Sequence, residues 1–244
     1  MKFVIGDIHG EITKLKQLVS QMSRYPIEEL FFVGDYLDKG ENSKATLLFL
    51  QEIATHFRCT FLQGDHEYAW LRFLKCGEYE QFLLRYGGKT TMRDFGITDL
   101  EPKIVEKKLY LPFQHFFQRL RPYVVLNEFI VSHSGINPTF ATRPRWESLG
   151  EKEFVFRRFD FIGYDKLVKA RKFIFGHTAF VSPYYDGWKI GIDTGAVYPR
   201  SGILTAFEIN KEYFLDHQGY TMNLSDINSS ACPILVNVGE QNDE

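Results

Sequence analysis

The chain has 244 residues, of which 44% are apolar and 25% are charged, and its formal net charge at pH 7 is −2. These values are ordinary for a globular protein, and so small a charge gives no basic field that would attract nucleic acid or an anionic membrane. Three scattered cysteines, no signal-peptide pattern and no apolar run of membrane-spanning length lead us to expect a cytoplasmic protein without a nucleic-acid or membrane partner.

Strand-like and helix-like segments alternate at the start of the chain. Short apolar runs predict strands at 2–5, 30–33 and 60–62, and helical spacing of apolar residues predicts helices at 11–22 and 43–57. Repeated strand–loop–helix units are typical of a parallel sheet with helices packed against it. We therefore predict an α/β fold.

The rest of the chain is predicted to be helical first and then to return to strands. A helical insertion is expected at about 68–122, and strand patterns follow at 123–132, 172–175, 188–192 and 202–209. No linker rich in proline, glycine or serine divides the chain, so residues 1–220 are expected to form one domain. Residues 221–244 are polar and weakly patterned, and we expect them to form a C-terminal tail that is partly disordered.

Aspartate and histidine recur where the predicted strands end. Gly-Asp follows each of the first three strands, and two later strands end at a histidine; the set comprises Asp7, His9, Asp35, Asp65, His66, His133 and His177. Open α/β sheets place their sites at the carboxyl ends of adjacent strands, and carboxylate and imidazole ligands without thiolates suit Mn²⁺, Fe or Zn²⁺. A helix cap, an Asx-turn or a core histidine could explain any one position, but recurrence at five strand ends favours a metal site.

Five short motifs resemble, in the same order, those of the calcineurin-like metallophosphoesterases. They are Gly-Asp-Ile-His-Gly (6–10), Gly-Asp-Tyr-Leu-Asp-Lys-Gly (34–40), Gly-Asp-His-Glu (64–67), Ser-His-Ser-Gly-Ile (132–136) and Gly-His-Thr (176–178). The chain looks most like the bacterial serine/threonine phosphoprotein phosphatases and their diadenosine tetraphosphatase relatives, also in segments 86–91 and 190–196. The resemblance covers roughly residues 2–209. It implies a four-layer sandwich of two mixed β-sheets flanked by helices, with residues 1–220 as the catalytic domain.

The same resemblance implies two divalent metal ions, with Mn²⁺ expected and Fe or Zn²⁺ as alternatives. The ligands would be Asp7, His9 and Asp35 for one metal, and Asp35, Asp65, His133 and His177 for the other. A carboxylate can bridge two cations, and two metals about 3.5–4 Å apart can share a hydroxide that attacks phosphorus in line.

The remaining roles implied by the resemblance concern the leaving group and the phosphate oxygens. His66 would be the general acid, oriented by Asp38. Lys39 and Arg158 would bind the phosphate through their positive charges, with Arg157 as a second choice to Arg158. A solvated turn lysine and an arginine pair on a helix face are the alternatives for these positions.

Two residues depart from the family pattern. Asp65 stands where the family usually has asparagine, so three carboxylates would face the four positive charges of two divalent ions. The added carboxylate should hold the metal more firmly but repel the phosphate dianion, so we predict weaker phosphate binding and slower turnover than after Asp65→Asn. Lys39 stands where the family usually has arginine, and lysine binds phosphate as a point charge without a bidentate fork.

We therefore expect an enzyme that hydrolyses phosphate monoesters, with phosphoserine and phosphothreonine in proteins as substrates, by attack of a metal-bridging hydroxide. The alternative substrate is a dinucleoside polyphosphate such as diadenosine tetraphosphate. A further alternative is a metal-binding protein whose catalysis is impaired by Asp65. Retention of both His66 and Asp38 argues against the last of these, since a silenced site has no need of an acid pair.

Overall fold

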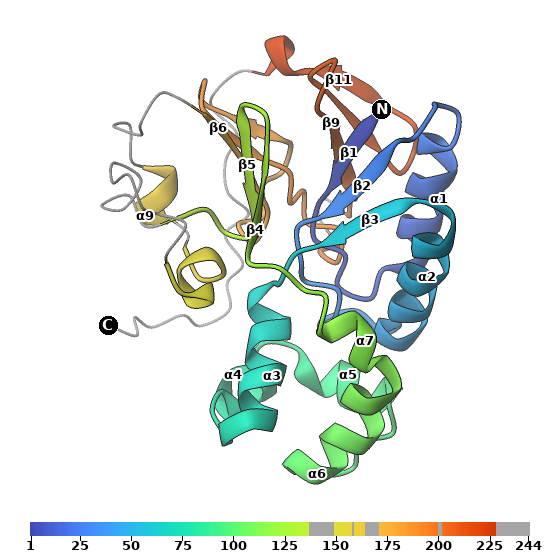
Figure 1. Cartoon of the computed structure of the whole chain (residues 1–244), viewed down its shortest axis with the longest axis vertical. Coiled ribbons are helices and arrows are strands. Elements are labelled where there is room, and N and C mark those ends of the chain that lie inside the picture. Colours follow the sequence, from blue (N-terminus) through green and yellow to red (C-terminus); the bar gives the residue numbers. More distant parts are fainter. Residues whose placement is uncertain (137–148, 158, 164–170, 200–201, 228–244) are drawn as a thin grey trace.

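The structure of the chain is a computed structural model that describes residues 1–136, 149–157, 159–163, 171–199 and 202–227 (Figure 1). In chain order the strands are β1 (Lys2–Ile5), β2 (Glu29–Phe32), β3 (Arg58–Phe61), β4 (Tyr123–Leu126), β5 (Phe129–Ser132), β6 (Lys172–Phe175), β7 (Tyr184–Tyr185), β8 (Lys189–Gly191), β9 (Thr205–Glu208), β10 (Tyr213–Asp216) and β11 (Thr221–Asn223). The α-helices are α1 (Ile12–Met22), α2 (Ser43–His56), α3 (Asp65–Cys76), α4 (Glu80–Arg85), α5 (Gly88–Asp94), α6 (Pro102–Val105), α7 (Gln114–Phe117) and α9 (Phe159–Ile162). Single turns of π- or 3₁₀-helix occur at η1 (Glu106–Tyr110), η2 (Leu111–Phe113), η4 (Glu151–Phe154) and η5 (Leu224–Asp226).

Both sheets are mixed. The first has the strand order β11-β10-β9-β1-β2-β3, in which β1, β2 and β3 are parallel and β9 is antiparallel to β1. The second has the order β4-β5-β6-β8-β7, in which β5, β6 and β8 are parallel. In each sheet the parallel strands lie side by side, so their carboxyl ends, and the segments that follow them, lie on the same side of the sheet.

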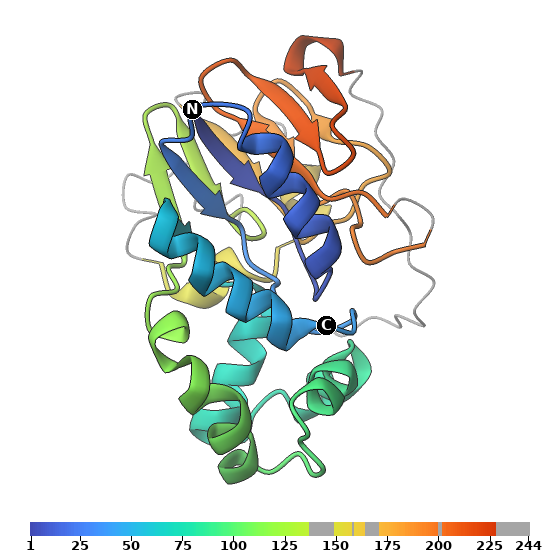
Figure 2. The same cartoon turned by 90° about the vertical axis from the view of Figure 1, so that its right-hand side faces the viewer.

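Alternating side chains on the strands separate three hydrophobic layers. Phe3 and Ile5 of β1 pack with helices α1 and α2, which cover the outer face of the first sheet (Figure 2). Val4, which points the other way, joins the layer between the two sheets, where it lies with Val131 of β5. Phe161 of α9 packs on the outer face of the second sheet. The chain therefore has the α/β fold expected from its sequence, two mixed sheets flanked by helices.

Helices α3 to α7 form a group below the sheets in the views of Figures 1 and 2, and their buried side chains join the same hydrophobic layer as those of α1 and α2. They follow β3 directly and end before β4, which agrees with the helical insertion expected at about 68–122. No helix among the described residues is long and apolar enough to cross a membrane.

Several details differ from the sequence-based expectation. Residues 123–132 form two antiparallel strands rather than one, because the chain reverses at Asn127, which has a φ of 51°. Strands β7 and β10 were not predicted. Strand β11 lies beyond residue 220, where we expected the tail to begin, and pairs with β10, so the first sheet includes residues 221–223. Residues 228–244 of the expected tail lie outside the described residues.

Candidate metal centre

The loops that follow the parallel strands of both sheets bring the predicted metal ligands together. Among the described residues, two groups of side chains could each hold a metal ion. Within each group, all the ligand atoms lie within 4.8 Å of one another. The groups are Asp35, Asp65, His133 and His177, and His9, Asp35 and His66. The first is the ligand set expected for one metal. The second shares Asp35 with it, but contains His66 where Asp7 was expected.

The backbone at this centre is unusual. Eight non-glycine residues among those described have positive φ, and five of them lie here: His9 (46°), Asp35 (52°), Asp38 (68°), Lys39 (62°) and His177 (64°). This left-handed conformation is uncommon for residues with a Cβ, and it is found preferentially at functional sites, where the surrounding structure holds it in place. The chain therefore holds the candidate ligands in a specific but locally unfavourable geometry.

Two histidines present one ring nitrogen to the centre because the other is already bonded. His9 Nδ1 donates to the carbonyl of Leu37 (2.8 Å), and His133 Nδ1 donates to the carbonyl of Val33 (3.1 Å). The Nε2 atom of His9 then lies 3.1 Å from Asp35, and that of His133 lies 3.2 Å from Asp65. Backbone carbonyls that fix the imidazole tautomer in this way are the usual second partners of metal-binding histidines.

Asp7 lies beside these groups, and one of its oxygens is left without a donor. Its Oδ2 accepts a hydrogen bond from the backbone N–H of His177 (2.9 Å), whereas its buried Oδ1 has no hydrogen-bond partner among the described residues. A Cβ on Gly176 would lie 2.0 Å from that Oδ1, so only glycine fits next to it. A buried carboxylate oxygen without a partner is costly, and a cation there would satisfy it. The Oδ1 of Asp7 therefore fits the role of a metal ligand, although neither of the two ligand groups includes it.

The buried charges of the centre shift one another's pKa values. Burial raises the pKa of Asp7, and the nearby Asp193 raises it further. Burial and Asp65 act to raise the pKa of Asp35 as well, but positive charge on the histidines, first of all His133, leaves it below its ordinary value. Burial lowers the pKa of His133, yet the surrounding carboxylates raise it to about 10. Carboxylates that stabilise the positive charge of a buried imidazolium can equally stabilise a divalent cation that binds the imidazole instead of the proton.

His66 and Asp38 form the pair that the sequence indicated. Nδ1 of His66 donates to Oδ2 of Asp38 at 2.7 Å, and both side chains are buried. The other ring nitrogen, Nε2, lies 4.0 Å from Asp35 and so faces the candidate metal ligands. Burial lowers the pKa of His66, but the neighbouring carboxylates outweigh burial and raise it. A protonated imidazole with its free N–H turned toward the centre is what a general acid requires.

Lys39 reaches the same centre, whereas Arg158 lies outside the described residues. The Lys39 ammonium donates to Nε2 of His9 (2.9 Å) and lies 5.7 Å from the centre of the Tyr198 ring. Burial lowers the pKa of Lys39, but Tyr198 and the carboxylates of the centre raise it overall. Arg157, the neighbour of Arg158, is paired with Glu153 at 2.6 Å.

Two residues of the centre were not assigned roles from the sequence. The buried carboxylate of Glu67 accepts hydrogen bonds from the backbone N–H groups of residues 35, 36, 37 and 64, at 2.9–3.2 Å, and so supports the loop that carries Asp35. Asp193 follows β8 closely, as Asp35 follows β2, and accepts from the backbone N–H of Gly195 (2.9 Å). Glu67 lies in the motif at 64–67, and Asp193 lies in the segment 190–196. The position of Asp193 just after a predicted strand could have indicated that it belongs to the centre.

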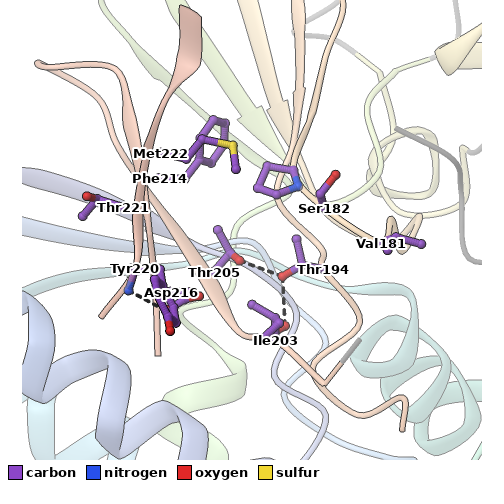
Figure 3. A pocket seen from close by; sticks show the side chains of 11 residues that line it. Val181, Ser182, Thr194, Ile203, Thr205, Phe214, Asp216, Tyr220, Thr221 and Met222 are labelled. Carbon is purple, nitrogen blue, oxygen red and sulfur yellow. Dashed lines mark hydrogen bonds between the residues drawn. The ribbon is translucent and has the colours of Figure 1, made fainter. Parts of the chain in front are cut away.

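A pocket of about 200 Å³ lies apart from these residues, beside β9, β10 and β11 (Figure 3). Its lining includes the exposed side chains of Val181, Tyr220 and Met222. Thr194, which follows Asp193, lines it too, but its hydroxyl is bonded to the carbonyl of Ile203 and to Thr205 (Figure 3). The pocket contains none of the predicted site residues.

Known proteins share both the sequence pattern and the fold of this chain. The sequence model of the calcineurin-like phosphoesterases matches residues 3–181. The fold is similar to that of a "putative diadenosine tetraphosphatase" (TM-score 0.62, 18% identity, 95% of this chain and 92% of that one). It is also similar to that of a cold-active protein-tyrosine phosphatase of the psychrophile Shewanella sp. (TM-score 0.64, 14% identity, 91% of this chain and 80% of that one). A serine/threonine phosphatase of Saccharomyces cerevisiae is similar as well (TM-score 0.53, 13% identity, 95% of this chain and 82% of that one). Such low identities show a common fold alone, whereas the family match covers most of the sequence. The chain therefore belongs to the calcineurin-like phosphoesterase family.

Proposed function

We propose that the chain is a binuclear metal-dependent phosphatase that hydrolyses phosphate monoesters. The observation that carries the proposal is the position of Asp35, which belongs to both groups of candidate metal ligands. A carboxylate shared in this way can hold two cations close together. We propose Asp7, His9 and Asp35 as ligands of one metal, and Asp35, Asp65, His133 and His177 as ligands of the other. Two bound divalent ions, for which we propose Mn²⁺ with Fe or Zn²⁺ as alternatives, would supply Lewis acidity and an activated water.

Side chains of the chain itself would protonate the leaving group and neutralise the charge of the phosphate. His66 would donate a proton from Nε2 to the leaving oxygen while Asp38 holds the imidazole through Nδ1. Lys39 would neutralise a non-bridging phosphate oxygen, and Arg158 is proposed for a second one.

Phosphoserine and phosphothreonine in proteins are the substrates we propose. An alkyl alcohol is a poor leaving group and needs a proton as the ester bond breaks, so a buried acid pair such as His66 and Asp38 is useful for these esters. A dinucleoside polyphosphate is the second candidate, favoured by the similar fold of the protein described as a diadenosine tetraphosphatase. The leaving group of a dinucleoside polyphosphate is already a weakly basic phosphate, for which the acid pair is less needed.

A cytoplasmic location is proposed as well, in keeping with the free thiols of Cys59 and Cys76.

A substrate comparison in Mn²⁺ tests the proposal. Purified protein would be assayed with a phosphoserine peptide, p-nitrophenyl phosphate and diadenosine tetraphosphate, and its metal content would be measured on the same sample. We expect two metals per chain and the highest kcat/KM on one of the two monoesters. Faster turnover of the dinucleotide would support the second candidate. Two bound metals with no turnover of any substrate would contradict an enzymatic role and support the metal-binding alternative.

A further inference from the structure

The carboxylate of Asp38 is held by more than its bond to His66. Three donors reach it: Nδ1 of His66 at 2.7 Å from Oδ2, the indole Nε1 of Trp70 at 3.0 and 3.1 Å from Oδ1 and Oδ2, and the hydroxyl of Thr91 at 2.6 Å from Oδ1. Asp38, Trp70 and Thr91 are all buried. The direction in which Asp38 faces His66 is therefore set by Trp70 and Thr91.

Thr91 bonds to Asp38 twice. Its hydroxyl oxygen accepts from the backbone N–H of Asp38 at 2.9 Å, and the same hydroxyl donates to the Asp38 carboxylate. One hydroxyl thus joins the main chain and the side chain of a residue whose φ is 68°, which fixes the side-chain rotation in a backbone conformation that few non-glycine residues adopt. Ser43 completes the arrangement, with its hydroxyl 3.2 Å from the Asp38 nitrogen and 3.1 Å from the Thr91 hydroxyl.

Trp70 acts from the same helix as His66. Both residues lie on α3, four positions apart, and side chains at this spacing occupy one face of a helix. The helix therefore presents an imidazole N–H and an indole N–H to the same carboxylate. A buried tryptophan needs a partner for its N–H, and here the partner is Asp38.

Thr91 belongs to the helical group rather than to the sheets, and the segment before it also contacts the Asp38 loop. The carbonyl of Gly87 accepts from the backbone N–H of Lys39 at 3.2 Å. A Cβ on Gly87 would lie 2.6 Å from that nitrogen, so only glycine allows this close approach. Gly87 thus fixes the backbone of Lys39, and Thr91 fixes Asp38.

We propose that Thr91 and Trp70 are positioning residues for protonation of the leaving group: they hold Asp38 so that it aligns His66. The inference rests on the proposed function, in which His66 is the general acid. Without the Thr91 hydroxyl, Asp38 loses one bond that fixes its rotation, and the His66 proton is less well aimed at the leaving oxygen. The loss should fall on esters whose leaving groups need that proton and should spare esters whose leaving groups do not.

Leaving-group dependence separates this role from a purely structural one. Thr91→Val removes the hydroxyl at nearly constant volume, and Thr91→Ser keeps it. Each variant would be assayed with an alkyl phosphate, whose alcohol needs a proton, and with p-nitrophenyl phosphate, whose phenolate leaves without one. For Thr91→Val we expect kcat/KM on the alkyl phosphate to fall roughly tenfold more than on p-nitrophenyl phosphate, a partial loss of the roughly 10²–10⁴-fold that one general acid contributes. Thr91→Ser should restore the wild-type ratio.

Thr90 provides a matched control. It is the neighbouring threonine on α5, and its hydroxyl donates to the carbonyl of Gly87 (2.8 Å) rather than to Asp38. Thr90→Val should therefore leave the ratio between the two substrates unchanged. If Thr91→Val does not fold, Trp70→Phe provides the same readout, because it removes the indole N–H and keeps an aromatic ring. Equal losses on both substrates in the folded variants would overturn the inference.

The same experiment keeps the two proposals apart. If the wild-type protein with Mn²⁺ hydrolyses neither substrate, the proposed function fails. If the wild type is active and Asp38→Asn shows the leaving-group effect while Thr91→Val and Trp70→Phe do not, the proposed function stands and only the positioning inference fails.

Discussion

Two parts of the molecule meet at the candidate metal centre, and they contribute different kinds of groups. The loops after β1, β2, β5 and β6, together with the first turn of α3, supply carboxylates and imidazoles that could hold metal ions. Helices α3 and α5 supply neutral N–H and O–H donors, from Trp70 and Thr91, that orient one of the buried carboxylates. The residues that directly follow the strands thus provide the charges, and two residues further along the helices align one of the carboxylates.

The two parts also obtain their geometry differently. Parallel strands place their carboxyl ends on the same side of a sheet, so the strand-end residues of each sheet lie together once that sheet forms. Packing of the two sheets then brings both sets of residues together. Trp70 and Thr91 do not directly follow a strand, and their contacts to Asp38 depend on how helices α3 and α5 pack against the loop that carries it. Changes at strand ends should therefore affect metal binding, whereas changes in the helices should affect the chemistry that follows it.

The largest effect is expected from Asp35→Asn, at the residue that belongs to both ligand groups. Loss of the shared charge should reduce the metal content from two per chain to one or none. Phosphatase activity should fall about a thousandfold, equivalent to roughly 4 kcal/mol of transition-state stabilisation. Elemental analysis and an assay with p-nitrophenyl phosphate would measure both quantities.

Asp99→Asn is the matched control for Asp35→Asn. Asp99→Asn removes one negative charge, as Asp35→Asn does. Asp99 is exposed and distant in sequence from every candidate ligand, so this change should not reach the metal centre. We expect it to keep both metals and full activity. If Asp35→Asn kept two metals per chain, binding of the second metal would not depend on a carboxylate shared by the two ligand groups.

Glu67→Gln tests whether α3 also supports the strand-end loops. The Glu67 carboxylate accepts from four backbone N–H groups, two of them in the residues Asp35 and Tyr36. Glutamine can offer only one acceptor oxygen, and its NH₂ would face donors. We expect the free energy of unfolding to fall by about 2–4 kcal/mol, since unsatisfied buried donors cost about 1–3 kcal/mol each. Urea unfolding would measure this change, with the exposed Glu80→Gln as the control. An unchanged unfolding midpoint would mean that the loop holds its shape without Glu67.

Most of the centre was predictable from the sequence because its ligands directly follow strands, within short motifs. Asp35, Asp65, His133 and His177 were named in advance and lie together. Trp70 and Thr91 were not, since a buried tryptophan and a helical threonine have many roles and only the folded contacts select one. Strand β11 was missed for a related reason: its residues are all exposed, so it has no apolar pattern, and it is held by pairing with β10.

Asp65→Asn tests the charge balance at the junction of the two parts, where β3 leads into α3. With two divalent ions, the carboxylates of Asp7, Asp35 and Asp65 leave a net charge of +1, and an amide at position 65 would leave +2. Inorganic phosphate should then bind roughly tenfold more tightly as a competitive inhibitor, since a unit charge within a few ångströms is worth a few kcal/mol at most. Asp99→Asn should leave the inhibition constant unchanged. An unchanged constant in Asp65→Asn as well would show that the third carboxylate does not repel the phosphate.

The smallest effect is expected from Lys39→Arg. The Lys39 ammonium faces the strand-end ligands, and Gly87 holds its loop. Arginine shares the Cγ that packs against Gly87, so the stem should keep its place, and its guanidinium can bind two phosphate oxygens where lysine binds one. We expect Lys39→Arg to lower the KM for p-nitrophenyl phosphate about threefold, and Lys39→Met, which keeps the stem without the charge, to raise it about tenfold. Because both variants change only the side chain beyond Cγ, opposite shifts in KM would assign the effect to charge and geometry at the phosphate. If Lys39→Arg instead raised KM, the space bounded by Tyr198 and Gly87 would be too small for the fork, and the helical group would be limiting the phosphate site as well as aligning the acid pair.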